Sequence, residues 1–133
     1  MGFHYIFVLS YNLLGRVTEK KDREGYNTAY SYTEAGDIKS IIYNDGKSVD
    51  YAYNSLRELS QVKDALGTIN IDSDKFGRTT KVVDYNGEEV SYRYGKNGER
   101  LKTLYPDGSS VSYEYDKYLR LTSLTSGNKR VDY

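Results

Sequence analysis

The sequence predicts an all-β protein: a repetitive antiparallel meander of β-hairpins, about 21 residues per hairpin, forming a curved ribbon. Three observations predict it. Apolar and aromatic residues alternate with polar residues in twos, glycines return at a fixed period, and turn residues stand between the alternating segments. Period-two alternation rich in β-branched and aromatic side chains is typical of half-buried strands, whereas a helix requires recurrence at three and four residues.

A repeat of about 21 residues runs through the chain. We take as the anchor of each repeat the position four residues after the second tyrosine of its Tyr-x-Tyr pair. Successive anchors are 21, 21, 20, 21 and 21 residues apart, and they are Gly15, Gly36, Arg57, Gly77, Gly98 and Leu119. A second glycine follows five of the six anchors after ten residues, at Gly25, Gly46, Gly67, Gly87 and Gly108. A period held over six copies indicates a repeat array.

The first strand of each hairpin is predicted from the residues before the anchor. Positions −8, −6 and −4 relative to the anchor are mostly apolar or aromatic, as in Val49, Tyr51 and Tyr53, while the residues between them are mostly polar or small. The segments after the anchor, such as residues 37–43 and 78–83, predict a second strand with a less regular pattern. Each repeat is therefore expected to be one two-stranded hairpin.

Turn signals of two alternating kinds separate the predicted strands. One kind precedes the anchor, as in residues 33–36 and 95–98, and the other precedes the second glycine, as in residues 44–46 and 106–108. Glycine at these places supplies the positive φ that tight hairpin turns require, and Asn or Asp before it tolerates the same backbone region.

Residues 1–133 are predicted to form a single repeat domain of about six hairpins. The fourth repeat is one residue short between Gly67 and Ile69 and carries Ile71-Asp72-Ser73 in place of Tyr-x-Tyr. We interpret this as a local irregularity of one turn and not as a domain boundary. Because residues 131–133 read as the opening of a seventh repeat, we expect the chain to be a fragment of a longer array.

Composition excludes several classes of function. With 133 residues and 15.3 kDa, the chain has room for one ordinary domain. Lys plus Arg and Asp plus Glu each number 19, and this balance argues against nucleic acid or an anionic membrane surface as the main partner. The absence of Cys excludes disulfides, thiolate metal sites and a cysteine nucleophile. No apolar run is long enough to span a membrane.

Few residues are candidates for chemistry, and we predict no catalytic, cofactor-binding or metal-binding residue. His4 is the only histidine and has no second His or Cys to share a metal, so we expect it to be structural or disordered. Residues 72–77 resemble a calcium loop only faintly, because Phe76 and Val83 stand where oxygen ligands are needed. The mixed charges of residues 20–24 favour a solvated hairpin tip. We therefore expect no enzyme activity.

The repeat pattern Tyr-x-Tyr-(Asp/Asn)-x-x-Gly-Arg-(Val/Ile/Leu) resembles the YD repeat, also called the Rhs repeat. Good matches are residues 11–17, 51–57 and 113–121, and the resemblance covers essentially the whole chain. This chain departs from the pattern at Arg57 and Leu119, which replace the anchor glycine, and in the fourth repeat, which lacks the tyrosines.

The resemblance implies a segment of a hollow β-shell built from a spiral of hairpins. In Rhs toxins and in the B and C components of Tc toxins, the shell encloses a toxin domain that is released after self-cleavage, and teneurins have a related shell. The cleavage segment carries an Asp-Pro-x-Gly-Leu-like motif, but the only proline here is Pro106, in Tyr-Pro-Asp-Gly. The resemblance therefore implies shell architecture without protease or toxin, and a protein that is secreted, on the cell surface or delivered by a secretion system.

The tyrosine pairs are the candidate site. They form a stripe that either packs the wall of the sheet or binds a ligand, and its members are Tyr30, Tyr32, Tyr51, Tyr53, Tyr92, Tyr94, Tyr113 and Tyr115. Recurrence in almost every repeat favours packing. Our first hypothesis is therefore a structural shell segment that encloses or presents a toxin or effector cargo. The alternative is a tyrosine-lined module that binds carbohydrate or protein. Self-association through sheet edges or the apolar face is also expected.

Overall fold

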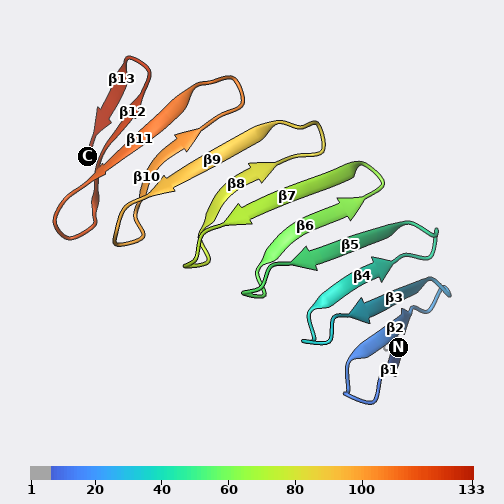
Figure 1. Ribbon diagram of the computed structural model, residues 1–133. Coiled ribbons are helices and arrows are strands. Elements are labelled where there is room, and N and C mark those ends of the chain that lie inside the picture. The colour runs from blue at the N-terminus through green and yellow to red at the C-terminus, as the bar shows by residue number, and fades with distance from the viewer. Residues whose placement is uncertain (1–6) are drawn as a thin grey trace, which may run out of the picture. The chain divides into compact units, whose positions relative to one another are not determined.

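The computed structural model describes residues 7–133, which form strands and turns and no helix (Figure 1). The described residues contain thirteen strands: β1 (Val8–Tyr11), β2 (Val17–Lys21), β3 (Asn27–Tyr32), β4 (Ile38–Ile42), β5 (Ser48–Tyr53), β6 (Leu59–Asp64), β7 (Gly67–Ser73), β8 (Thr79–Val83), β9 (Glu89–Tyr94), β10 (Arg100–Leu104), β11 (Ser110–Tyr115), β12 (Leu121–Ser126) and β13 (Lys129–Asp132). The prediction of an all-β fold is confirmed. His4 lies outside the described residues.

The chain comprises two compact units, one ending at Thr68 and the other beginning at Ile69. Within each unit, strands that follow one another in the sequence pair antiparallel. In the first unit, Ile41 of β4 faces Val49 of β5. In the second unit, Val82 of β8 faces Val90 of β9 in the equivalent position. The predicted hairpin meander is confirmed in each unit, while the assignment of residues 1–133 to a single domain stays a prediction.

A register shift occurs at the same place in each hairpin whose turn contains an anchor residue. In the second repeat, Ser31 faces Ser40 but Tyr32 faces Ile38, so Lys39 is an extra residue on β4. The same register shift occurs between Ala52 and Tyr53 and between Glu114 and Tyr115. An extra residue of this kind is a β-bulge, which disrupts the hydrogen-bond ladder locally and bends the strand. The −4 residue of each repeat therefore lies beside a bulge.

Ten turns of the described chain share one backbone geometry. In each, the amide of the first residue donates to the carbonyl of the fifth, and the amide of the fourth donates to the carbonyl of the first. The fourth residue always has positive φ, including Arg57 at 63° and Leu119 at 62°. This is a β-turn followed by a left-handed residue, a common hairpin connection. The two kinds of turn expected from the sequence thus differ in side chains and not in backbone.

Two connections depart from this geometry and have two-residue loops. Ala65 and Leu66 connect β6 to β7, where the fourth repeat is one residue short, and Gly127 and Asn128 connect β12 to β13. After the second loop, Val131 faces Leu124 in the same way that Val49, the first strand residue of its repeat pattern, faces Ile41. Val131 and Asp132 therefore lie in β13 in the register of a repeat opening.

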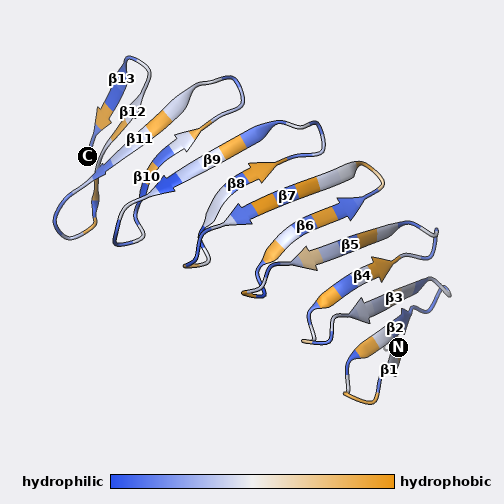
Figure 2. Cartoon of the chain, viewed as in Figure 1, coloured by the Kyte–Doolittle hydropathy of each residue, from blue (hydrophilic) through white to orange (hydrophobic). Residues whose placement is uncertain are grey.

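No apolar side chain of residues 7–133 is fully buried, because each unit is one layer of sheet. The buried side chains are Thr103 and Ser123, which are 3% and 1% exposed. Apolar segments recur along the strands (Figure 2). In β5, Tyr51 and Tyr53 are half-buried and Ala52 between them is exposed. One face of the sheet is thus apolar and is covered mainly by its own neighbouring side chains.

Candidate functional site

The second tyrosine of each pair makes the same cross-repeat hydrogen bond. The hydroxyls of Tyr32, Tyr53, Tyr94 and Tyr115 donate to the backbone carbonyls of Val17, Ile38, Thr79 and Arg100, at 2.5, 2.7, 2.6 and 2.8 Å. Each acceptor lies 15 residues earlier, at position +2 after the preceding anchor. We call this contact the tyrosine latch. It ties each of these repeats to the one before it.

The latch fits the local backbone. Position +2 borders the bulge, where the ladder is disrupted, and a carbonyl there is satisfied by a side-chain donor. The phenol ring spans the distance between hairpins and brings half-buried apolar area to the contact. Burial raises the pKa of the Tyr53 hydroxyl, with a further contribution from the Asp37 carboxylate, so this group stays a hydrogen-bond donor at neutral pH.

Arginine at position +1 adds a second cross-repeat contact. The Arg78 guanidinium lies 4.9 Å from the ring centroid of Tyr94 and donates to the Gly95 carbonyl at 3.2 Å. Arg16 lies 5.7 Å from the ring centroid of Tyr32 in the same relation. A guanidinium over an aromatic face is attracted by the ring quadrupole. The arginine of one repeat therefore covers the latch tyrosine of the next.

The Asp or Asn at position −3 organises the anchor turn. Oδ1 of Asp74 accepts the amides of Phe76 and Arg78, and its Oδ2 accepts Nε of Arg78 at 2.7 Å. Burial alone would raise the pKa of Asp74, but these amides and the guanidinium hold it below the usual 3.8. The same two amide bonds recur at Asn12, Asn54 and Asp116. Side chains that mimic a backbone turn in this way favour Asp and Asn.

The second repeat reverses the polarity of the arginine contact. Asp37 stands at position +1, and Arg57, at the next anchor, donates to Asp37 from Nε at 3.0 Å and from Nη2 at 2.8 Å. Nη2 also donates to the Ala35 carbonyl at 3.1 Å. The hydrogen bonds from Arg57 hold the pKa of Asp37 below its usual value. A bidentate pair thus takes the place of the contact that Arg16 and Arg78 make, and helps hold Arg57 at positive φ.

The first tyrosines of the pairs share no common hydroxyl bond. The Tyr113 hydroxyl lies 3.3 Å from Oγ1 of Thr103, and the ring centroid of Tyr92 lies 4.5 Å from the Arg100 guanidinium. Tyr30 and Tyr51 are half-buried on the same strands. The eight predicted residues therefore divide into four latch tyrosines and four that contribute a ring. Whether the stripe serves for packing or for ligand binding stays a prediction.

The remaining sequence candidates take part in ordinary turn and strand contacts. Asp72 pairs with Lys81 at 3.1 Å, and Asp74 is a turn acceptor. Asp22, in the charged run of residues 20–24, is the acceptor of its own turn. Among residues 7–133, no group of His, Cys, Asp and Glu is placed to hold a metal ion. Nor does this part of the chain contain a helix able to cross a membrane.

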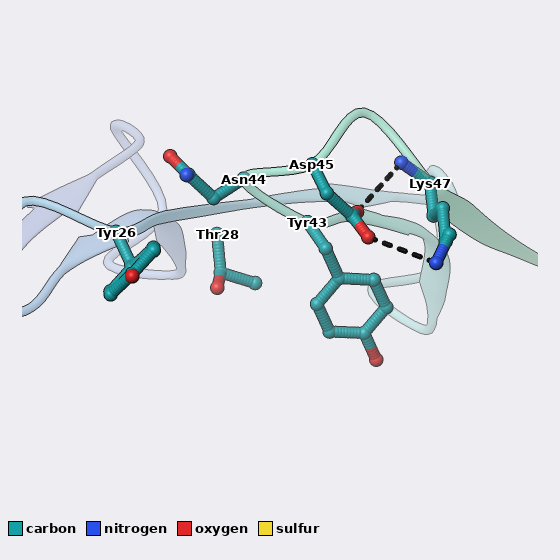
Figure 3. Close-up of a pocket in the computed structure, with 6 residues that line it drawn as sticks. All are labelled: Tyr26, Thr28, Tyr43, Asn44, Asp45 and Lys47. Atoms are coloured by element: carbon teal, nitrogen blue, oxygen red, sulfur yellow. Dashed lines mark hydrogen bonds and ion pairs between the residues drawn. The ribbon is translucent and has the colours of Figure 1, made fainter.

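An aromatic groove lies at the turns that precede the second glycines. Its volume is about 430 Å³, and it is lined by Tyr26, Thr28, Tyr43, Asn44, Asp45 and Lys47. In Figure 3 the rings of Tyr26 and Tyr43 lie on either side of Thr28, with the ion pair of Asp45 and Lys47 at 3.2 Å near Tyr43. The two tyrosines are 55% and 44% exposed. A second groove of about 290 Å³ shares Tyr43 and extends to Leu66.

Sequence reasoning missed these two tyrosines because neither stands at position −6 or −4. The available signal was their place within three residues of a turn glycine, Gly25 or Gly46, where an aromatic side chain is expected to remain exposed.

Comparison with known proteins identifies a family from the sequence. The family model described as teneurin YD-shell matches residues 3–133. The chain is 26% identical over 117 residues to double-stranded DNA deaminase toxin A of Burkholderia cenocepacia (strain H111), covering 87% of this chain and 8% of that protein. Because this chain is repetitive throughout, the shared segment consists of repeats.

Solved structures show the same fold. The crystal structure of TcdB2-TccC3-Cdc42 matches with a TM-score of 0.76 and 13% identity, covering 92% of this chain and 7% of that chain. That of TcdB2-TccC3 matches with a TM-score of 0.74 and 16% identity, covering 92% and 8%. The chain thus spans less than a tenth of the length of these relatives. Since the family model covers nearly all of its repeats, this chain belongs to the teneurin YD-shell family.

Proposed function

We propose that this chain is a non-enzymatic wall segment of a YD shell that encloses or presents a toxin or effector cargo. The observation that carries the proposal is the tyrosine latch, which joins successive hairpins although the sheet has no second layer and no buried apolar core among residues 7–133. Such a sheet is held together along its length, as a wall requires, and does not need to close around its own core.

The likeness to toxin chains supports the choice of cargo. The deaminase toxin and the TcdB2-TccC3 chains are many times longer than this chain, and in each the matched part is a small share of the whole. The proposal therefore assigns wall building to the repeats and toxicity to other parts of such proteins. Secretion, or delivery by a secretion system, follows as part of the same proposal.

The test uses the product of the complete coding sequence that contains this array. We expect electron cryomicroscopy to show a closed shell and trypsin to leave an enclosed segment uncut. Joint replacement Tyr53→Phe and Tyr94→Phe removes two latch hydroxyls and should make that segment accessible. The matched pair Tyr51→Phe and Tyr92→Phe should leave it protected. A product with no enclosed segment, or equal cleavage in all samples, would contradict the proposal.

A second candidate function is a binding module for carbohydrate or protein, and the groove between Tyr26 and Tyr43 favours it. Exposed aromatic rings beside polar turn groups suit a sugar face, and a glycan array tests this. We expect the double variant Tyr26→Ala and Tyr43→Ala to lose any signal, and the double variant Tyr85→Ala and Tyr105→Ala, also at exposed tyrosines, to keep it. An array without a reproducible signal excludes the carbohydrate form of this candidate.

Self-association through sheet edges or the half-covered apolar face stays a prediction. Sedimentation velocity of the 133-residue chain measures it directly, and we expect species larger than a monomer whose share grows with concentration. A single monomeric species at high concentration contradicts the prediction.

A further inference from the structure

Two exposed grooves adjoin at the turns of the first compact unit. The larger, of about 430 Å³, has Tyr26 on one side and Tyr43 on the other (Figure 3). The smaller, of about 290 Å³, extends from Tyr43 to Leu66, one hairpin further along the sheet. Tyr43 and Lys47 line both grooves. We call the two grooves together the turn channel, and it lies wholly within the unit that ends at Thr68.

The turn channel repeats with the period of the hairpins. Neighbouring strands of a sheet lie about 4.8 Å apart, so equivalent turns of successive hairpins are about 9.6 Å apart. A polyproline II helix has about three residues per turn and rises about 3.1 Å per residue, so every third side chain returns to the same side after about 9.3 Å. The two periods agree closely. A peptide in this conformation can therefore place one side chain in each groove, three residues apart.

The lining of the channel suits the apolar side chains of such a peptide. Tyr26 and Tyr43 are 55% and 44% exposed, and their rings form two walls with Thr28 between them (Figure 3). Val49 and Leu66 line the smaller groove. Grooves with aromatic walls bind polyproline II segments well, because the helix is already formed and little conformational entropy is lost on binding.

The channel also offers hydrogen-bond donors to a peptide backbone. A polyproline II helix has no internal hydrogen bonds, so its carbonyls accept bonds from outside. Within residues 7–133, the hydroxyls of Tyr26 and Tyr43 have no hydrogen-bond partner. A tyrosine hydroxyl at the edge of an aromatic groove can donate to a peptide carbonyl while its ring packs on the peptide.

Charge indicates what should flank the apolar residues of the peptide. Among the side chains that line the channel, Asp45 pairs with Lys47 at 3.2 Å, whereas Asp64 is exposed and has no ion-pair partner in the described part of the chain. Oδ1 of Asp64 accepts the Leu66 amide at 2.8 Å, which holds this carboxylate at the smaller groove. A fixed carboxylate complements a basic residue. The charge complement of the channel is therefore Arg or Lys near Asp64.

We propose that the turn channel binds an extended, proline-rich peptide segment in the polyproline II conformation, with apolar residues three apart and a basic residue at the end nearer Asp64. The proposal rests on the second candidate function and specifies its protein form. The agreement between the hairpin period and the peptide period favours a peptide over carbohydrate as the ligand.

Fluorescence anisotropy with two labelled peptides and the 133-residue chain tests the proposal. One peptide repeats the triplet Pro-Pro-Leu and ends in two arginines, and the other has the same composition with its leucines moved out of the three-residue period. We expect saturable binding of the first and roughly tenfold weaker binding of the second. Equal affinities, or no binding of either peptide, would overturn the proposal. A glycan-array signal without peptide binding would do the same and favour the carbohydrate form.

Two pairs of substitutions locate the site. Tyr26→Ala with Tyr43→Ala should weaken binding of the periodic peptide by roughly tenfold. Phe76→Ala with Tyr118→Ala removes two rings that are 71% and 67% exposed at anchor turns, and should leave binding unchanged. Equal affinities of the two double variants would place binding outside the channel and overturn the proposal. Neither pair includes a latch tyrosine, so this proposal and the wall proposal can fail separately.

Asp64→Asn tests the charge of the channel. It keeps an oxygen acceptor for the Leu66 amide and removes the carboxylate charge. We expect it to weaken binding of the arginine peptide at low salt, and to leave unchanged the binding of the same peptide with glutamines in place of the arginines. An equal effect on both peptides contradicts the assigned orientation. If the Tyr26 and Tyr43 double variant does not fold, by circular dichroism, this comparison decides the proposal instead.

Discussion

The two kinds of turn in this chain have the same backbone geometry but differ in the contacts of their side chains. Turns at the anchors, such as residues 74–78, carry arginine and aspartate side chains that reach into the next or the preceding repeat. Turns at the second glycines, such as residues 43–47, border open aromatic grooves and carry mainly local side-chain contacts, although Oδ1 of Asn44 accepts the amide of Asn27 from the preceding repeat at 3.1 Å. The difference teaches that backbone geometry sets the fold, while side chains decide which turns join repeats through charged groups and which leave aromatic rings exposed.

Asp74→Ala should reduce the stability of the chain most strongly, because it alters a turn that carries an anchor. It removes the acceptor of two backbone amides and the partner of Arg78, so we expect it to lower the urea midpoint more than the other variants do. Urea denaturation measures it. Asp74→Asn keeps the acceptor, as Asn12 and Asn54 do, and should lower the midpoint by a smaller amount. Equal losses for both variants would show that the charge, and not the turn acceptor, matters.

Tyr53→Phe tests the latch hydroxyl alone. It removes the bond to the Ile38 carbonyl and keeps the ring, so we expect a loss of about 1 kcal/mol in the free energy of unfolding. Tyr51→Phe, two residues away on the same strand, should change it by less than about 0.5 kcal/mol. A loss as large at Tyr51 as at Tyr53 would remove the distinction between the two tyrosines of a pair.

Leu119→Gly should stabilise an anchor turn. Leu119 has a φ of 62°, where an L side chain is strained, and glycine relieves about 1 kcal/mol. The rise is read from the urea midpoint of the chain. Leu56→Gly, at a turn position without positive φ, is the control and should give no gain. A loss at Leu119 would mean that its side chain makes a contribution that outweighs the strain.

Acid should weaken the anchor turns gradually. The folded-state pKa values of Asp37, Asp74 and Asp116 lie below the usual 3.8. Such groups stabilise the fold above their unfolded pKa and lose this contribution as pH falls through the folded value. The urea midpoint should therefore change little from pH 7 to pH 5 on their account and drop below about pH 4. In Asp74→Asn with Asp116→Asn the drop should be smaller, and an unchanged drop would assign it to other carboxylates.

Tyr43→Ala should have the smallest effect on stability. Its ring is 44% exposed at the groove, and we expect a change within about 0.5 kcal/mol. The same variant should weaken any ligand signal from the groove. A large loss of stability would show that the Tyr43 ring itself couples repeats.

Much of the fold could be predicted from the sequence because it depends on local rules. Alternation predicts the strands, and the positions of Gly36 and Gly46 predict where φ is positive. These features need only nearby residues, so a single sequence contains them. The period assigns Arg57 and Leu119 to anchor positions, but their residue types left the type of turn there open, and the structure gives both residues a positive φ.

The division of the tyrosine pairs could not be predicted, because it depends on the register between strands. Strict alternation gives Tyr51 and Tyr53 the same face and equivalent roles. The bulge beside Tyr53 distinguishes them, and only Tyr53 has the Ile38 carbonyl within reach of its hydroxyl. The ion pair between Arg57 and Asp37 could not be predicted for the same reason, because its two partners are 20 residues apart in the sequence.

The short reach of these contacts bears on how the chain folds as it is made. The cross-repeat hydrogen bonds described above join residues at most 22 positions apart. Each hairpin can therefore complete its contacts once little more than one further repeat has left the ribosome. Chains dominated by local contacts order quickly, and translation adds only about 5–20 residues per second. A wall of this kind can assemble at the pace of its own synthesis, one hairpin after another.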